Sequence, residues 1–291
     1  MELRQLKYFV RSAELLNFTE AANDLFISQS TLSQQIKQLE DELDMLLFDR
    51  VGKRVRLTEA GNLFLTYARQ SLQDANDGKQ IIEDLKGLKA GTLKIGATYG
   101  LSALLNSTIV AFTKLYPQVK VAVDFGTSED LLEKLKIAEI DFVLSFLQPP
   151  DTNVFESEIL FDSKLSLIVH TSHPFASKKK IDIKELQNIH LALPAKGFNT
   201  RDFLEDVFAK NKISPVVNVE LNDINMLLQL VETGNWCTVL TIASASGRTN
   251  LRTVPITGIE LTREASITWL KDAYRKKAAT VFAEMIKKQI G

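Results

Sequence analysis

The stretch SQSTLSQQIKQLE, residues 28–40, decides the fold of the first part of this chain. Its leucines and isoleucine recur at three- and four-residue spacing, which predicts a helix with one apolar face from about Gln29 to Glu42. Ser28 stands immediately before that helix, where its hydroxyl can accept a hydrogen bond from a free backbone N–H. The predicted core stripe consists of Leu32, Ile36, Leu39 and Leu43.

The residues before this helix predict two more helices. The first is marked by an apolar stripe at helical spacing, which consists of Leu3, Leu6, Phe9, Val10 and Ala13. Thr19 is the predicted cap of a short second helix, in which the small side chains of Ala21 and Ala22 allow another helix to approach closely. Two short helices joined by a tight turn indicate a helix-turn-helix.

The polar face of the third helix has the chemistry of a DNA-reading surface. Opposite the apolar stripe, at about 100° per residue, lie Gln29, Ser30, Ser33, Gln34 and Lys37. Gln and Ser side chains can hydrogen-bond to base edges in the major groove, and Lys also neutralises phosphate. An ordinary solvated helix face has the same composition, so this helix alone leaves both interpretations open.

The next segment favours DNA. Residues 48–57, FDRVGKRVRL, alternate basic and apolar side chains about a glycine, which predicts a two-stranded wing. The outward-facing cations are Arg50, Lys53, Arg54 and Arg56, and such a cluster suits a phosphate backbone. The net charge of the whole chain is only −1, so local clustering rather than overall basicity has to attract nucleic acid.

Several segments together resemble the signature of LysR-type transcriptional regulators. They are Phe18-Thr19 through Ala21-Ala22, residues 28–40, Leu47 to Arg50 and Leu57 to Gly61. By this resemblance the third helix enters the major groove of double-stranded promoter DNA, and the wing contacts phosphates or the minor groove. Many members carry proline where this chain has Ser30 and arginine where it has Gln34. Glutamine prefers adenine where arginine favours guanine, so the operator base at Gln34 stays open.

A long amphipathic helix follows the wing. Thr58 is its predicted cap, and it runs from Glu59 to about Lys89. Apolar residues recur at heptad-like spacing, interrupted by Lys79, and they are Ala68, Leu72, Ala75, Ile82 and Leu85. A second subunit is the simplest partner for this stripe, which predicts a homodimer, whereas packing on its own domain is the alternative. The resemblance further implies a dimer of dimers, a homotetramer.

The second half of the chain contains a repeat of strand, helix, strand, helix, strand. The first copy comprises 93–97, 101–116, 119–125, 128–138 and 141–146, and the second comprises 189–193, 200–211, 216–221, 224–233 and 236–241. Such alternation predicts parallel sheets flanked by helices, hence two α/β lobes with a ligand crevice at the carboxyl ends of their strands. Segments 155–170 and 251–270 lie outside the repeats and are expected to connect the lobes.

The predicted fold class is therefore mixed. A helix-rich winged helix-turn-helix domain and a long linker helix precede a two-lobed α/β domain, which by resemblance is an effector-binding domain similar to periplasmic binding proteins. The predicted boundaries are 1–58 for the DNA-binding domain, 59–90 for the linker and dimerisation helix with its hinge, and 91–291 for the effector-binding domain. Within the last, lobe I covers about 91–162 and 267–291, and lobe II covers about 163–266.

Candidate effector contacts lie where the first strand of each lobe meets its helix and where the next helix of lobe I begins. Hydroxyl or amide side chains there are Thr98, Ser102, Thr127, Ser128, Asn199 and Thr200. Free N–H groups at helix starts attract anions, so we expect a small anionic effector, with Lys196 or Arg201 as its counter-charge. The alternative for each residue is a capping hydroxyl or a solvated cation without a ligand.

Composition narrows the class of protein. The first residues, MELRQLKYFV, mix charged with apolar side chains and differ from a secretory signal, and apolar runs such as 142–147 are too short to span a bilayer, so we expect a cytoplasmic protein. A single cysteine, Cys237, excludes an internal disulfide, and we expect neither metal nor cofactor.

Two other classes share the two-lobed scaffold. An enzyme would need a nucleophile with its base, a carboxylate cluster or metal ligands, and the sequence shows no such motif. A solute-binding protein would need export, and its first ninety residues would be unexplained. The favoured hypothesis is a regulator in which effector binding alters lobe closure, and the paired DNA-binding heads then change the DNA bend and the contact with RNA polymerase.

Overall fold

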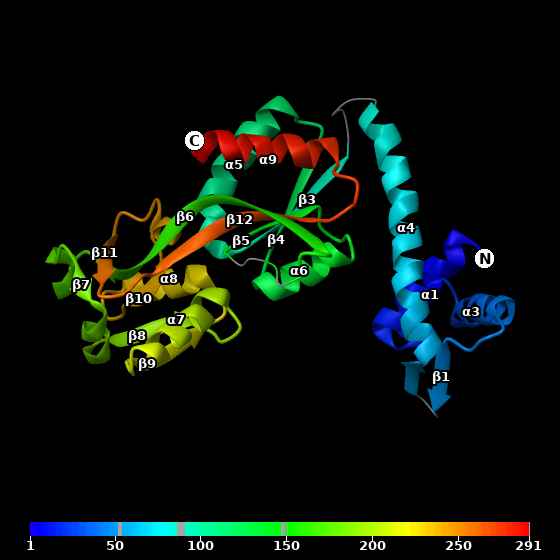
Figure 1. Ribbon diagram of the computed structural model, residues 1–291, viewed down its shortest axis with the longest axis horizontal. Coiled ribbons are helices and arrows are strands. Elements are labelled where there is room, and N and C mark those ends of the chain that lie inside the picture. The colour runs from blue at the N-terminus through cyan, green and yellow to red at the C-terminus, as the bar shows by residue number, and fades with distance from the viewer. Residues whose placement is uncertain (52–53, 86–90, 147–148, 150, 291) are drawn as a thin grey trace. The chain divides into compact units, whose positions relative to one another are not determined.

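The computed structural model describes residues 1–51, 54–85, 91–146, 149 and 151–290. The chain divides into two units, Met1–Leu85 and Lys86–Gly291 (Figure 1). Within the described ranges, every helix is too short or too polar to cross a membrane.

The first unit is built on three helices whose positions agree with the sequence prediction. They are α1 (Leu3–Leu15), α2 (Phe18–Asp24) and α3 (Gln29–Leu43). Their shared core includes Phe9, Leu32 and Ile36, all with fully buried side chains. The Ser28 hydroxyl caps α3 as expected, because it accepts from the Thr31 N–H at 3.1 Å.

The cap predicted for the second helix was wrong. Asn17 rather than Thr19 caps α2, since its Oδ1 accepts from the N–H groups of Thr19 and Glu20 at 3.0 and 3.3 Å. The helix therefore begins two residues earlier than predicted, at Phe18, whose ring packs edge-on against Phe48. Asn17 stands directly before the helix, where its side chain reaches the free N–H groups of the first turn. Thr19 lies inside the helix and cannot act as its cap.

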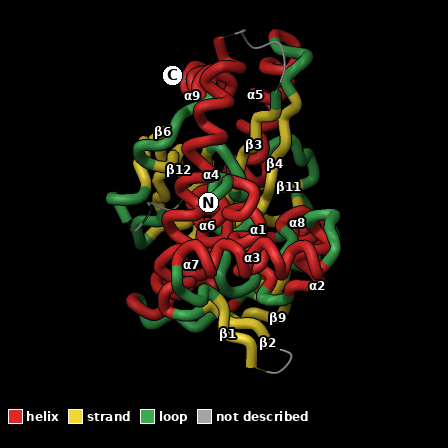
Figure 2. Tube along the Cα trace, turned by 90° about the vertical axis from the view of Figure 1, so that its right-hand side faces the viewer, coloured by secondary structure: helices red, strands yellow, loops and turns green. Residues whose placement is uncertain are grey.

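A short antiparallel hairpin follows α3, as predicted for the wing. It pairs β1 (Phe48–Val51) with β2 (Arg54–Leu57), and Figure 2 shows it projecting from the unit below α3. The Glu40 carboxylate, buried at the end of α3, accepts from the N–H groups of Leu47 and Phe48 at 2.8 and 3.1 Å. One side chain thereby holds the end of α3 and the start of the hairpin together.

Helix α4 (Glu59–Leu85) begins where predicted, and the Thr58 hydroxyl accepts from the Gly61 N–H at 2.9 Å. The predicted seam is only partly correct. Ala68 and Leu72 pack into the core of the first unit, whereas Ile82 is exposed. The side chain of Leu85 and residues 86–90, which include most of the expected hinge, lie outside the described residues.

A different stripe of α4 is exposed at heptad spacing. Large apolar side chains occupy its ends, at Leu63 and Tyr67 and again at Ile81, with exposed fractions of 65%, 72% and 41%. Gln70 and Asp74 continue the same stripe between them. The side chains of α4 that pack inside the first unit therefore lie on a different face of the helix from the exposed side chains that another chain could contact.

Lobe I of the second unit has the predicted order of elements. Its parallel strands are β3 (Thr92–Ala97), β4 (Lys120–Phe125) and β5 (Phe142–Ser145), and its helices are α5 (Ser102–Leu115), α6 (Ser128–Lys136) and the carboxyl-terminal α9 (Lys277–Ile290). One buried cluster lies under α5 and α9, and another lies under α6 on the opposite face of the sheet (Figure 1). The return of the chain to lobe I is as expected.

Lobe II repeats this pattern. Its strands are β8 (His190–Pro194), β9 (Val216–Leu221) and β10 (Thr238–Thr241), with helices α7 (Asn199–Lys210) and α8 (Ile224–Glu232). Strands β8 and β9 pair in parallel. Strands β7 (Ile181–Asp182) and β11 (Leu251–Thr257) extend the edge.

Two long antiparallel strands join the lobes. They are β6 (Phe155–His170) and β12 (Thr262–Leu270), and they run side by side through the middle of the sheet (Figure 1). The sheet order β4-β3-β5-β12-β6-β11-β7 places lobe I strands on one side of this pair and lobe II strands on the other. Both segments that lie outside the repeats therefore connect the lobes, as the sequence predicted.

Candidate DNA interface and effector pocket

The polar face of α3 is open to solvent. Four of the five predicted DNA contacts are exposed, namely Gln29, Ser30, Gln34 and Lys37. The fifth, Ser33, is half-buried and its hydroxyl accepts a hydrogen bond from the Gln29 side-chain amide at 2.9 Å. Because these side chains project from one rigid helix, they can meet a row of base edges together.

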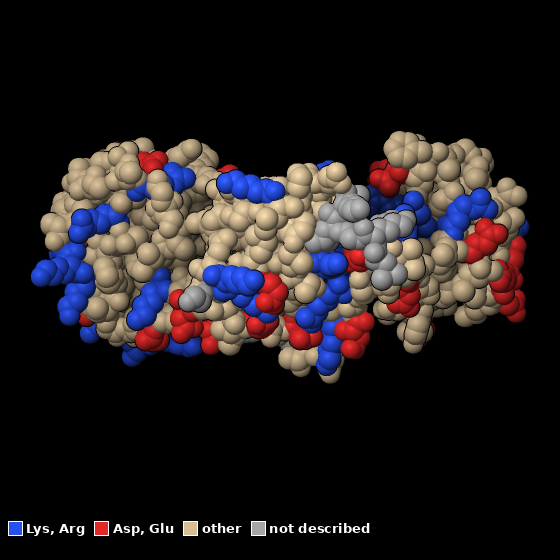
Figure 3. All heavy atoms as spheres, turned by 90° about the horizontal axis from the view of Figure 1, so that it is seen from above, with Lys and Arg blue, Asp and Glu red and all other residues tan. Residues whose placement is uncertain are grey.

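The wing is described only in part. Arg56 is exposed on β2, which suits a phosphate contact. Lys53 lies outside the described residues, as do the side chains of Arg50 and Arg54. Figure 3 shows one face of the molecule, on which basic and acidic side chains are interspersed, consistent with a net charge near zero.

One prominent residue of the helix-turn-helix was not predicted from the sequence. Phe26 lies in the turn directly before the α3 cap, has a φ of 54° and is 94% exposed. An aromatic side chain with positive φ is strained and gains nothing from burial here. The sequence does not indicate that Phe26 is exposed, because it lies in the apolar run Leu25-Phe26-Ile27 and three adjacent apolar residues are usually buried.

The second unit contains a pocket between its two lobes. It holds about 490 Å³ of space, open in part to solvent, which suits a small metabolite. Lobe I contributes Thr98, Tyr99, Gly100, Gly126, Thr127, Ser128 and Phe146, and lobe II contributes Pro194, Phe198, Asn199, Thr200, Ile224, Leu240, Thr241 and Ser244. These residues follow the carboxyl ends of strands in both lobes, the location that open α/β sheets use for ligands.

Two hydroxyl groups of this pocket have no partner in the described part of the protein. They are Thr98 Oγ1, directly after β3, and Ser128 Oγ, in the first turn of α6. Both oxygen atoms are buried, and Ser128 as a whole is only 2% exposed. A buried hydroxyl without a hydrogen bond costs free energy of about 1–3 kcal/mol, so both favour a ligand with matching polar groups.

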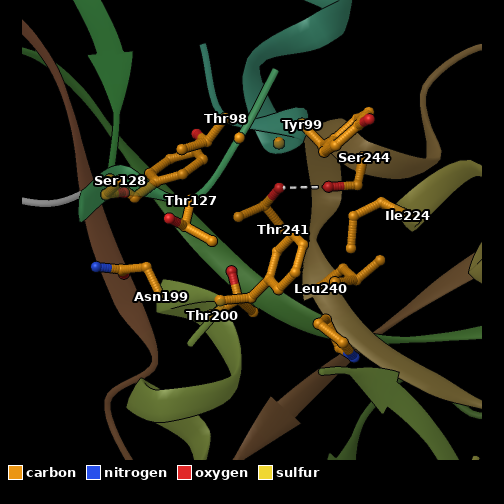
Figure 4. Close-up of a pocket in the computed structure, with 15 residues that line it drawn as sticks. Thr98, Tyr99, Thr127, Ser128, Asn199, Thr200, Ile224, Leu240, Thr241 and Ser244 are labelled. Atoms are coloured by element: carbon orange, nitrogen blue, oxygen red, sulfur yellow. Dashed lines mark hydrogen bonds between the residues drawn. The ribbon is translucent and has the colours of Figure 1, made fainter. Parts of the chain in front are cut away.

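Other polar groups of the pocket are already paired. The Thr127 hydroxyl caps α6, since it accepts from the Asp130 N–H at 3.2 Å and contacts the Asp130 carboxylate at 2.6 Å. Thr241 and Ser244 share a hydrogen bond of 2.8 Å, drawn as the dashed line in Figure 4. In the same view Asn199 lies at the edge of the group.

The structure brings five of the eight candidate effector residues into this pocket: Thr98, Thr127, Ser128, Asn199 and Thr200. Ser102, the first residue of α5, and Lys196, exposed in the loop before α7, are not among the lining residues. Arg201 is turned away and buried. Its guanidinium donates to the Pro194 carbonyl at 3.1 Å and pairs with Glu205 and Glu220, so it has no charge to spare for an effector.

Several lining residues were not predicted. Phe146 follows β5 and Thr241 ends β10, which are the third strands of the two repeats. The predicted contacts lie only at the ends of the first strands and of one second strand. Carrying the repeat to the third strands would have found both positions, because equivalent strand ends meet at one edge of a sheet.

Outside the pocket, the described residues include a buried thiol close to a histidine. Cys237 is buried 3.4 Å from His173 Nε2, and burial raises the pKa of its thiol to about 11. A thiol held protonated in this way is a poor nucleophile. Among the described residues, no group of three or more His, Cys, Asp or Glu side chains could hold a metal ion.

Comparison with known families accounts for almost the whole chain. Residues 3–62 match the family described as "Bacterial regulatory helix-turn-helix protein, lysR family", and residues 86–291 match "LysR substrate binding domain". The chain belongs to the LysR family of transcriptional regulators. It is therefore a DNA-binding regulator with an effector-binding domain, not an enzyme.

This LysR-family protein is similar to named transcriptional regulators, and the similarity covers nearly the full length of both chains. It is 32% identical to a "Probable RuBisCO transcriptional regulator" of Thalassiosira pseudonana, over 96% of this chain and 95% of that protein. It is also 32% identical to the "Transcriptional dual regulator GltC" of Bacillus subtilis (strain 168), over 98% of this chain and 96% of that protein.

Solved structures agree with the fold. A full-length OxyR variant from Pseudomonas aeruginosa has a TM-score of 0.75 and 27% identity, covering 99% of this chain and 95% of that one. CbnR, solved with its target DNA, has a TM-score of 0.58 and 24% identity with complete coverage of both chains, and this supports the fold alone.

Proposed function

We propose that this regulator recognises promoter DNA through the exposed face of α3. Gln29, Ser30, Ser33, Gln34 and Lys37 contact base edges, and the cations Arg50, Lys53, Arg54 and Arg56 of the wing anchor phosphates. The support is the exposure of this face on a helix that is fixed by a cap at one end and by Glu40 at the other. Base contacts set sequence preference, whereas phosphate contacts add affinity for any sequence.

The second part of the proposal is a small anionic effector in the inter-lobe pocket. Its polar groups pair with Thr98 and Ser128, while Thr127, Asn199 and Thr200 complete the contacts. The observation that carries this proposal is the pair of buried hydroxyls at the pocket that have no partner among the described residues. A ligand that supplies the missing hydrogen bonds recovers the free energy lost on burying these oxygen atoms.

Effector binding is then transmitted by lobe closure. The pocket has lining residues on both lobes, so a ligand that contacts both favours the closed arrangement. The proposed unit is a homodimer through the exposed stripe of α4, assembled into a homotetramer in the cytoplasm. A change in the spacing of the DNA-binding heads alters the DNA bend and the contact with RNA polymerase.

The experiment is selection of bound genomic fragments by the purified full-length protein. The variants are Gln34→Ala for base contact, Arg54→Ala for phosphate contact and, as a control, Lys136→Ala at an exposed cation of lobe I. We expect Q34A to relax sequence preference. R54A should lower affinity equally for all sequences and reduce the slope of log affinity against log salt by about 1, and K136A should behave as wild type.

The outcome that contradicts the proposal is equally clear. If the wild-type protein enriches no fragment at low salt, with or without cell metabolites, sequence-specific DNA binding is wrong. If Q34A and K136A select the same sequences as wild type, Gln34 does not read a base.

A further inference from the structure

One half-buried cation contacts residues of the pocket and has no acidic partner among the described residues. Arg263 is on β12 opposite Ser163 of β6, where these paired strands pass from one lobe to the other. Its Nη2 donates to the Phe146 carbonyl at 2.5 Å and to Asn199 Oδ1, and its Nη1 donates to the Asn199 carbonyl at 3.2 Å. Phe146 belongs to lobe I, Asn199 belongs to lobe II, and both line the pocket.

The partners of Arg263 are all neutral. Over the part of the chain that the structure describes, no carboxylate lies within ion-pair distance of its guanidinium, whereas Arg201 has two such partners and Arg248 has Glu232. Besides the carbonyl and amide oxygens, it contacts the face of the Phe203 ring, 4.6 Å from the centroid. Burial lowers the pKa of Arg263 to about 10, because desolvation disfavours the charged form.

The guanidinium also retains donors. Arginine has five N–H groups in a planar fork, and three of them are used in the bonds above. The Nε–H and one Nη1–H have no acceptor among the described residues. The described residues that line the pocket include no Lys, Arg or His, so none of them offers a positive side chain to an anion.

We propose that Arg263 is the counter-charge for an oxyanion group of the effector, a carboxylate or a phosphate, bound at the junction of the two lobes. This inference rests on the proposed effector function and replaces Lys196 and Arg201 in that role. An anion near a desolvated guanidinium restores the electrostatic stabilisation that water gave it, and a charge-assisted, bidentate pair with arginine is stronger than a neutral hydrogen bond.

The same contact gives a route to regulation. Arg263 donates to one carbonyl of lobe I and to two oxygens of lobe II, so it links two residues that line the pocket from opposite lobes. An anion that competes for these N–H groups weakens the bonds to both lobes at once. Ligand charge is thereby coupled to lobe closure through one side chain.

The test measures thermal unfolding of the full-length protein by tryptophan fluorescence while chloride is replaced by acetate, phosphate or sulfate at constant ionic strength. Both tryptophans, Trp236 and Trp269, lie in the second unit. The variants are R263Q, which removes the charge, R263K, which keeps the charge but loses the fork, and Arg252→Gln as an exposed control. Acetamide serves as the uncharged counterpart of acetate.

We expect at least one of the three anions to stabilise wild type and R252Q in a saturable manner. Acetamide should stabilise neither protein. The rise in unfolding temperature with acetate is compared with the rise with phosphate, and the larger rise identifies the oxyanion that the site prefers. R263Q should weaken the apparent affinity tenfold or more, and R263K should weaken it while unfolding at the wild-type temperature without ligand, which separates binding from folding.

Two results would overturn the inference. One is the same dose response in wild type and R263Q, and the other is the absence of a saturable response to all three anions. The proposed effector function is distinguishable from the assignment of the charge. If a neutral metabolite changes DNA binding through Thr98 and Ser128 but independently of Arg263, the pocket stands and the assignment of the charge falls.

Discussion

Removal of the two unpartnered hydroxyls of the pocket should stabilise the protein and abolish its response to effector. The changes are Thr98→Val and Ser128→Ala, which keep the side-chain size nearly constant and delete one oxygen atom each. In most buried positions the loss of a hydroxyl removes a hydrogen bond and lowers stability. Here neither Thr98 Oγ1 nor Ser128 Oγ has a partner among the described residues, so the sign reverses.

The magnitude follows from the cost of an unsatisfied hydroxyl. That cost is about 1–3 kcal/mol for a fully dry group, and a water molecule in the pocket recovers part of it, so we expect a gain of about 1 kcal/mol for each change. Two threonines supply matched controls. Thr108 donates to the Leu104 carbonyl at 2.8 Å and should lose about 1 kcal/mol as T108V. Thr238 Oγ1 is also unpartnered but does not line the pocket, so T238V should be stabilised with an unchanged effector response.

Urea unfolding followed by tryptophan fluorescence is the appropriate assay, because both tryptophans report on the second unit. Effector response is measured in parallel, as the change in affinity for a selected promoter fragment when cell metabolites are added. A decrease in stability of T98V equal to that of T108V would refute the reasoning, since it would mean that the Thr98 hydroxyl is satisfied. Retention of the full effector response in the double variant would refute its role in binding.

Other perturbations test the remaining elements. Glu40→Ala, which leaves two buried N–H groups without their carboxylate, should destabilise the first unit by about 3 kcal/mol in helix-detected unfolding while tryptophan fluorescence is unchanged, and Asp41→Ala is the exposed control. Asn17→Ala should cost about 1 kcal/mol in the same assay. Tyr67→Glu, on the exposed stripe of α4, should shift sedimentation toward the monomer. Because burial raises the pKa of Cys237, its unfolded thiol ionises first as pH rises, so wild type should lose stability relative to C237A between about pH 9 and 11 and not below.

The sequence predicted what local periodicity determines. Every strand and helix of the two repeats was found within about two residues, because helix and strand spacing are properties of the neighbouring residues alone. The caps at Ser28 and Thr58 were correct for the same reason. The cap at Thr19 was wrong because Asn17 competes for the same N–H groups, and two capping residues so close together cannot be ranked without the backbone geometry.

Contacts between distant residues were beyond this reasoning. Arg201 was interpreted as a free cation, although its partner Glu205 stands one helical turn away and was visible in the sequence; its other partner, Glu220, is on a different strand. In the same way, Ala68 and Leu72 fit a dimer seam by spacing but pack against helices far away in the chain. A periodic pattern shows which face is apolar and leaves open what covers that face.

The position of Arg263 explains why a half-buried charge without an acidic partner among the described residues can persist here. A carboxylate from the chain beside it would neutralise the site permanently, and the two lobes would be held in one arrangement whether or not a ligand was present. Neutral carbonyls hold the guanidinium more weakly, so their bonds can be exchanged for an external anion at a smaller cost. The unpartnered hydroxyls of Thr98 and Ser128 follow the same logic, because each leaves its strongest interaction to be made by the ligand. A ligand shifts a conformational equilibrium only by the difference in its affinity for the two states, and groups left unsatisfied in the empty pocket make that difference large.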